Sequence, residues 1–219
     1  MGYLEAAVVV YLRAALGFAP ELVGPGTDTM TAATVGALLP AEVAREAATL
    51  AMIAAVGWLA GRTSLERLAW AAVVFGAWDI TYYAGLRVLI GWPPSIAAWD
   101  VLFLVPAPWV GPVWAPVGVS ATLVGFGLAA ARQLRRGAGL HVGPARLAVA
   151  AAGWLLVVAS FLVDGERVLA GNTAPWSGWP LYLLGMALGI GAAASAWIGS
   201  GPPRDRAPAA GGAGDSPKR

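Results

Sequence analysis

Several ionisable side chains lie inside or beside long apolar runs of this chain, where they could bind a proton, a cation or a charged ligand. Asp79 is the most prominent, because no charged or strongly polar residue precedes it back to Leu68. A charge at membrane depth is costly, so it marks a functional site or is paired with an opposite charge. Tyr83 and Arg87 follow at i+4 and i+8 on the same helical stripe, with Tyr82 beside them.

A second polar stripe occurs in the preceding apolar run. Glu42, Arg45, Glu46 and Thr49 fall at i, i+3, i+4 and i+7, which is one face of a helix. This face could be a solvated helix start at the membrane surface. If this face points toward Asp79, Arg45 could pair with Asp79 in a purely structural role. Tyr82 and Arg87 are two other possible partners of Asp79.

A third group combines Asp100 with Trp99 and Trp109 in a proline-rich segment. Carboxylates beside aromatic faces suit an organic cation, although an aromatic belt at the membrane interface explains tryptophans equally well. Asp164, Glu166 and Arg167 are expected to cap a later helix on the same side. The candidate binding residues are therefore Glu42, Arg45, Glu46, Asp79, Tyr82, Tyr83, Arg87, Trp99, Asp100 and Trp109.

The residue inventory excludes many kinds of chemistry. The chain has no cysteine, one histidine (His141) and one lysine (Lys218). Thiolate metal sites, cysteine nucleophiles, bis-histidine haem and a Schiff base inside the membrane are therefore excluded. No nucleotide-binding loop or hydrolase motif is present. The sequence predicts no cofactor and no resident metal.

The composition indicates that lipid is the main solvent. Hydrophobic residues make up 58% and charged residues 12% of the 219 residues, and the mean hydropathy is +0.69. Soluble domains carry about 25% charged residues. The net charge of +2 is too small, and too scattered, to predict a nucleic-acid partner. The fold class is therefore an all-α integral membrane protein, with the bilayer as its first partner.

Five apolar runs are long enough to span a bilayer as helices, which takes roughly 20 residues. These predicted spans are Ala41–Gly61, Leu68–Ile90, Pro112–Ala131, Leu147–Val163 and Trp179–Gly199. The first run, Tyr3–Ala19, contains Glu5 and Arg13, so it either spans or lies on the outer surface as an amphipathic helix. The prediction is a polytopic bundle of about six transmembrane helices, or five if this helix lies on the surface.

The uncharged run Val101–Ala131 is too long for one straight span and contains Pro106, Pro108, Pro112 and Pro116. We expect Asp100–Gly111 to be a half-helix or a re-entrant element. The positive-inside rule supports this prediction. If the arginines at 62–67, 132–146 and 204–219 are all cytoplasmic, only one crossing fits between Trp92 and Ala131. The carboxylates then face outward, and the C-terminus lies on the cytoplasmic side of a bacterial inner (plasma) membrane.

The domain organisation is simple. Residues 1–200 are expected to form the transmembrane domain, with Gly24–Leu39 as an outer loop. Residues 201–219, rich in Pro, Gly and Ala, are expected to form a disordered cytoplasmic tail. Gly185 and Gly189 begin a small-residue stripe on the last helix that could contact other membrane subunits.

Three functions fit this pattern. The favoured one is an outward-facing acidic and aromatic pocket that binds or transports a small molecule, a cation or protons. The alternatives are an accessory or assembly subunit of a membrane complex and an intramembrane enzyme. The enzyme hypothesis requires Glu46, Asp79 and Asp100 to converge as an acid/base pair or as ligands of a hard cation, and it is the less favoured one.

Overall fold

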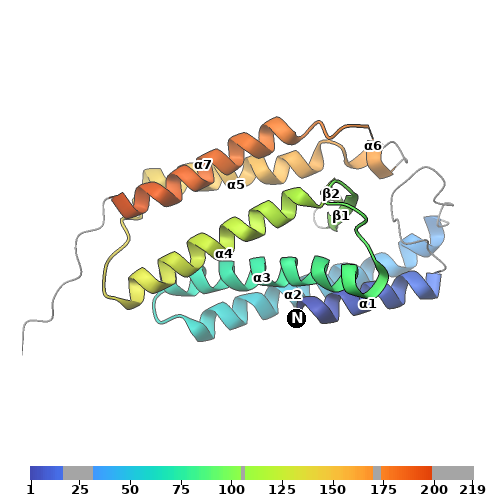
Figure 1. The fold of residues 1–219 in the computed structure, drawn as a ribbon, viewed down its shortest axis with the longest axis horizontal. Coiled ribbons are helices and arrows are strands. Elements are labelled where there is room, and N and C mark those ends of the chain that lie inside the picture. Colours follow the sequence, from blue (N-terminus) through green and yellow to red (C-terminus); the bar gives the residue numbers. More distant parts are fainter. Residues whose placement is uncertain (17–31, 105–106, 170–173, 199–219) are drawn as a thin grey trace, which may run out of the picture.

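The computed structural model describes residues 1–16, 32–104, 107–169 and 174–198, and the described part is mostly helical (Figure 1). Its elements in chain order are α1 (Gly2–Leu16), α2 (Ala32–Ala60), α3 (Ser64–Ile90), β1 (Trp99–Phe103), β2 (Trp109–Pro112), α4 (Trp114–Arg135), α5 (Pro144–Leu162), α6 (Gly165–Leu169) and α7 (Trp179–Ile198). Among the described residues, five helices are long and apolar enough to cross a membrane, namely α2, α3, α4, α5 and α7. The prediction of a mostly helical fold with five helices of membrane-spanning length and apolarity is confirmed.

The long helices lie side by side, so that their termini collect at two ends of the bundle (Figure 1). We call one the arginine end; it holds the α2–α3 turn, the α4–α5 connection and the end of α7. The other is the carboxylate end, which holds the end of α3, the β1–β2 hairpin, α6 and the start of α7. One candidate span, α4, lies between Trp92 and the second arginine group, as the parity argument predicted.

The helices form two packed groups. In the first, α3 contacts α1, α2 and α4, whereas in the second α5 packs along α7. Glycines allow the second contact, since a Cβ on Gly153 would lie 2.8 Å from the Gly185 carbonyl oxygen and 2.9 Å from the Gly189 nitrogen. The small-residue stripe is therefore used, at Gly185, for packing within the chain. Its predicted contact with other subunits stays a prediction.

The first helix lies along the second half of α3. A Cβ on Gly85 would lie 2.9 Å from the Ala6 Cβ, and Arg13 lies over the ring of Trp92 just beyond α3. With 15 residues, α1 is about 22 Å long, shorter than a hydrocarbon core of about 30 Å. It is not among the five candidate spans, so a sixth span stays a prediction.

Two expectations about local structure were wrong. Residues 32–39 do not form a loop, because α2 begins at Ala32 and continues through Pro40; the run of alanines and leucines there favours a helix. The Asp100–Gly111 segment is not a half-helix but an antiparallel hairpin in which Asp100 pairs with Gly111. Prolines exclude a regular helix there, and the β-branched and aromatic residues of the two strands favour extended pairing. A re-entrant position of this hairpin stays a prediction, and the predicted tail 201–219 lies outside the described residues.

Candidate functional site at the carboxylate end

Asp79 lies on the face of α3 that packs against α4. It is 8% exposed, and the Ser120 hydroxyl of α4 donates a 2.8 Å hydrogen bond to its Oδ2. The two helices approach closely here because residue 76 is glycine; a Cβ on Gly76 would collide with the Ser120 carbonyl oxygen. The partner of Asp79 is therefore a serine, and the predicted pairing with Arg45 or Arg87 is not observed.

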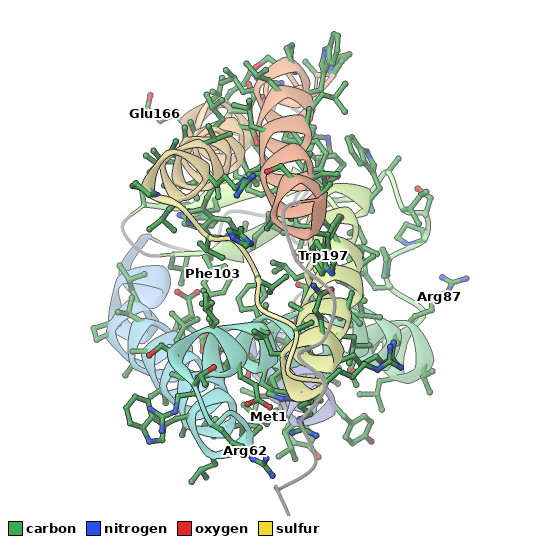
Figure 2. All side chains as sticks on the ribbon, turned by 90° about the vertical axis from the view of Figure 1, so that its left-hand side faces the viewer. Met1, Arg62, Arg87, Phe103, Glu166 and Trp197 are labelled. Carbon is green, nitrogen blue, oxygen red and sulfur yellow. The ribbon has the colours of Figure 1, made fainter. Side chains whose placement is uncertain are left out.

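Arg87 lies outside the site. Its side chain is exposed and extends away from the bundle (Figure 2). The guanidinium donates to the carbonyl oxygens of Gly91 and Pro93 just after α3. A cation at a helix C-terminus satisfies carbonyl groups that lack a partner within the helix. As the spacing from Asp79 predicted, Arg87 is on the same helix and stripe as Asp79. It lies about two turns further along α3, however, and this position is beyond the buried region.

Asp100 is the most enclosed carboxyl group of the site. It is 1% exposed in β1, and the Tyr83 hydroxyl of α3 donates to its Oδ2 at 3.0 Å. The other oxygen, Oδ1, meets no hydrogen-bond donor in good geometry within the described residues. Burial raises the pKa of Asp100 to about 7, against the opposing effects of the Tyr83 hydroxyl and the Arg13 guanidinium. This carboxyl group therefore changes charge near neutral pH.

Arg13 of α1 is a buried charged residue beside Asp100 that is not among the residues selected from the sequence. It is only 5% exposed, and its guanidinium lies 4.8 Å from the centroid of the Trp92 ring. It is close enough to Asp100 to favour the ionised carboxylate. A signal was present in the sequence, because Glu5 and Arg13 stand at i and i+8 on one stripe of an otherwise apolar helix.

The stripe on α2 is confirmed as a polar face, and it points at α1. Arg45 forms ion pairs with Glu42 (2.7 Å) and with Glu5 of α1. The Thr49 hydroxyl donates to Glu5 at 3.2 Å. Half-buried charges thus connect α1 to α2, whereas the sequence allowed only a solvated helix start or a partner for Asp79.

Glu46 connects α2 to the hairpin. Its two carboxylate oxygens accept the Leu104 amide at 3.0 and 3.1 Å, although the residues are 58 positions apart. Glu46 is 7% exposed. The amide of Leu104 follows directly after β1, so this contact fixes the strand that carries Asp100. A backbone donor of this kind cannot be identified from residue types.

The aromatic candidates divide between the site and its surroundings. Tyr82 packs against Tyr83 at 5.1 Å between ring centroids and is near both Arg13 and Arg45. Trp109 contacts Phe103 at 5.5 Å and stacks on Phe161 of α5 at 6.3 Å. Figure 2 shows Phe103 in the middle of the molecule, between the two helix groups. Trp109 therefore joins these groups, and its predicted role in binding a cation stays a prediction.

Trp99 contacts one of the capping residues. The Arg167 guanidinium lies 5.9 Å from the Trp99 ring centroid, and binding of an organic cation by Trp99 stays a prediction. Asp164 accepts hydrogen bonds from Arg167 (3.2 Å) and from the Ser177 amide (2.8 Å) and hydroxyl (2.6 Å). These contacts fix the connection from α5 to α7, while Glu166 extends outward (Figure 2).

The structure thus brings most of the predicted site together and adds α1 to it. We define the polar cluster as the charged side chains Glu5, Arg13, Glu42, Arg45, Glu46, Asp79 and Asp100 with the hydroxyls of Tyr82, Tyr83 and Ser120. Its five carboxyl groups and two guanidinium groups leave a formal excess of three negative charges. In the described part of the chain, no three acidic or histidine side chains converge in a way that could hold a metal ion.

Comparison with protein-family models, with curated proteins and with solved structures gives no match for this chain. The geometry of the polar cluster and the placement of the candidate spans therefore carry the functional argument.

Proposed function

We propose that this protein binds a proton at Asp100 and couples that proton to the binding or transport of a small solute or cation across the membrane. The observation that carries the proposal is the burial of Asp100 with only one of its two carboxyl oxygens hydrogen-bonded in good geometry. A buried ionisable group with an incompletely satisfied carboxyl is a functional-site candidate. A pKa near 7 for Asp100 keeps both charge states accessible under ordinary conditions.

Three elements meet at this carboxyl group, which gives a proton a way to affect structure. Asp100 is on the hairpin, Tyr83 is on α3 and Arg13 is on α1. When ionised, Asp100 attracts Arg13 and accepts from Tyr83. When protonated, it loses most of the attraction to Arg13 together with the desolvation cost of its buried charge, so the balance of contacts between the hairpin and α1 changes. A proton can therefore bias the relative position of these elements.

Asp79 supplies a second, deeper carboxyl group on the same helix as Tyr83. It lies one turn further from the carboxylate end and is bound to α4 through Ser120. Under the positive-inside rule the arginine end faces the cytoplasm. In the proposed orientation, in a bacterial inner membrane, Asp100 then lies toward the outer side. Asp79 lies deeper, toward the cytoplasmic side.

The alternative functions have less support. Glu46, Asp79 and Asp100 each bond to a different element, and the described residues contain no group of three that could hold a metal ion. A carboxylate-dependent enzyme would need them to converge. The accessory-subunit hypothesis drew on the small soluble mass and on the Gly185 stripe, and Gly185 packs on α5 within the chain.

The test is the pH dependence of unfolding in detergent micelles. Folded Asp100 has a pKa of about 7, whereas an unfolded aspartate has about 3.9. Between these values the folded state holds a proton that the unfolded state has lost. The free energy of unfolding should therefore decrease as pH rises from about 4 to 7, by up to about 1.4 kcal/mol per pH unit, and this contribution should level off above pH 7.

Asp100→Asn should remove this slope, and infrared difference spectra should lose a carboxyl band that titrates near pH 7. Glu166→Gln, an exposed carboxylate at the same end, is the matched control and should change neither measurement. If the folded Asp100→Asn protein keeps both the slope and the band, the proposal is wrong. Uptake of a panel of solutes into proteoliposomes under an imposed pH gradient then tests coupling, and any solute taken up by the wild type should not accumulate with Asp100→Asn.

A further inference from the structure

A groove lies between α4 and α7 on the side toward the arginine end. The two helices touch near the carboxylate end, where the Tyr182 hydroxyl donates to the Ala115 carbonyl oxygen at 3.0 Å. Toward the arginine end a space of about 690 Å³ lies between them. Figure 2 shows Trp197 at the edge of α7 that faces α4. The groove is lined by Ala121, Thr122, Gly125, Phe126, Ala129, Ala194 and Trp197.

The lining is almost entirely apolar. The Thr122 hydroxyl, the one hydroxyl group of the lining, is bonded to the Gly118 carbonyl oxygen at 2.9 Å and so already has an acceptor for its proton. The rings of Phe126 and Trp197 lie 5.6 Å apart and form an aromatic wall. Around Gly125 the space is open, since a Cβ there would meet no atom within 4 Å. An occupant must therefore be slender and apolar.

The same stripe of α4 becomes basic where it leaves the groove. Arg132 follows Ala129 by three residues, and Arg136 follows Arg132 by four, so both continue the helical face that lines the groove. Both side chains are exposed, and neither forms a hydrogen bond or ion pair within the described residues. The neighbouring Arg135, in contrast, turns toward α3 and pairs with Glu66 at 2.8 Å.

We propose that this groove binds an anionic phospholipid, with an acyl chain between α4 and α7 and the phosphate at Arg132 and Arg136. Basic sites beside transmembrane helices on the cytoplasmic side attract anionic headgroups. The volume is that of a small-molecule site, about 300–1,000 Å³. A partner helix fills roughly 400 Å³ per turn, so the groove would accept fewer than two turns. This site is separate from the polar cluster, and the proposal stands without the proposed proton function.

The charge part of the proposal can be measured by native mass spectrometry. The purified full-length protein is exchanged into an equimolar mixture of dioleoyl-phosphatidylglycerol and dioleoyl-phosphatidylcholine, and retained lipid is counted. The wild type should retain phosphatidylglycerol preferentially. The double variant R132Q/R136Q should weaken that preference about thirtyfold, the loss expected for two basic residues near an anionic headgroup. R62Q/R67Q removes the same charge beside the α2–α3 turn, none of whose residues lines the groove, and it should keep the preference.

The apolar part is tested by filling the groove. Gly125→Leu should reduce retention of both lipids at least tenfold without lowering the melting temperature, because the added side chain enters open space. Gly139→Leu, at an equally open loop glycine, is the matched control and should retain lipid as the wild type does. Equal retention of the two lipids by the wild type would overturn the proposal. So would unchanged binding in Gly125→Leu, or a groove occupied by a protein subunit that Gly125→Leu releases while lipid counts stay constant.

Discussion

The two ends of the bundle use charge in different ways. In the polar cluster at the carboxylate end, charged side chains are buried or half-buried and connect elements that are distant in sequence. Arg45 joins α2 to α1 through Glu5, and Glu46 joins α2 to the hairpin. At the arginine end, the ion pair between Arg135 and Glu66 involves a guanidinium that is 53% exposed, and Arg132 and Arg136 extend into solvent.

The difference follows from what each set of charges has to do. A basic residue at a helix end can specify orientation while it stays hydrated, so it needs no protein partner. A buried charge must be compensated by a partner or a hydrogen bond, because its desolvation is costly. The charges of the arginine end therefore indicate the topology of the chain. The charges of the polar cluster instead depend on specific contacts with partners from other elements.

The largest expected change in the free energy of unfolding comes from Arg45, and the same substitution at Arg135 provides the comparison at the arginine end. Arg45→Gln should lower the free energy of unfolding by about 2–3 kcal/mol, because Glu5 and Glu42 lose their common cation in a half-buried setting. Arg135→Gln should cost clearly less, since its guanidinium is mostly hydrated. Denaturant unfolding in detergent micelles measures both. Equal losses would show that the two ends do not differ in this way.

Much of the fold could be predicted because apolar length and charge asymmetry are properties of the sequence alone. The five candidate spans lie close to the apolar runs identified from composition, and parity correctly left one helix between Trp92 and the second arginine group. The hairpin could not be predicted in the same way. Prolines show where a helix fails, but the pairing of Asp100 with Gly111 depends on the partner strand and on Glu46, which is far away in sequence.

The candidate residues could be selected by residue type, whereas their hydrogen-bond partners could not be predicted. Asp79 and Asp100 were selected as candidates because ionisable groups in apolar surroundings are rare. Their partners, Ser120 and Tyr83, depend on how α3 is rotated against α4 and the hairpin. A lone serine in an apolar run carries no signal of its own. Arg13 did carry one, as an arginine in an apolar helix, but its role depends on α1 packing beside α3.

A smaller difference in the free energy of unfolding is expected between two buried serines, one bonded to another helix and one bonded within its own helix. Ser120→Ala should lower the free energy of unfolding by about 1–3 kcal/mol, because Asp79 would remain buried without its donor. Ser160→Ala removes an equally buried hydroxyl whose partner, the Val157 carbonyl oxygen, belongs to the same helix. Its cost should be lower, since that carbonyl oxygen is also available to the backbone ladder of α5. Thermal melting in detergent compares the two variants, and an equal decrease would mean that Ser120 does not serve as a specific link.

The smallest effect is expected at Arg87, which belongs to the carboxylate end by position but not by contact. Arg87→Gln removes the hydrogen bonds to Gly91 and Pro93 at the end of α3, so it should cost no more than about 1 kcal/mol. The infrared titration of Asp100 should not move, because the side chain is exposed and extends away from the polar cluster. A shift in that midpoint would mean that the field of Arg87 reaches Asp100. The polar cluster would then extend to the surface of the carboxylate end. The two ends of the bundle would in that case differ only in how strongly their charges are hydrated.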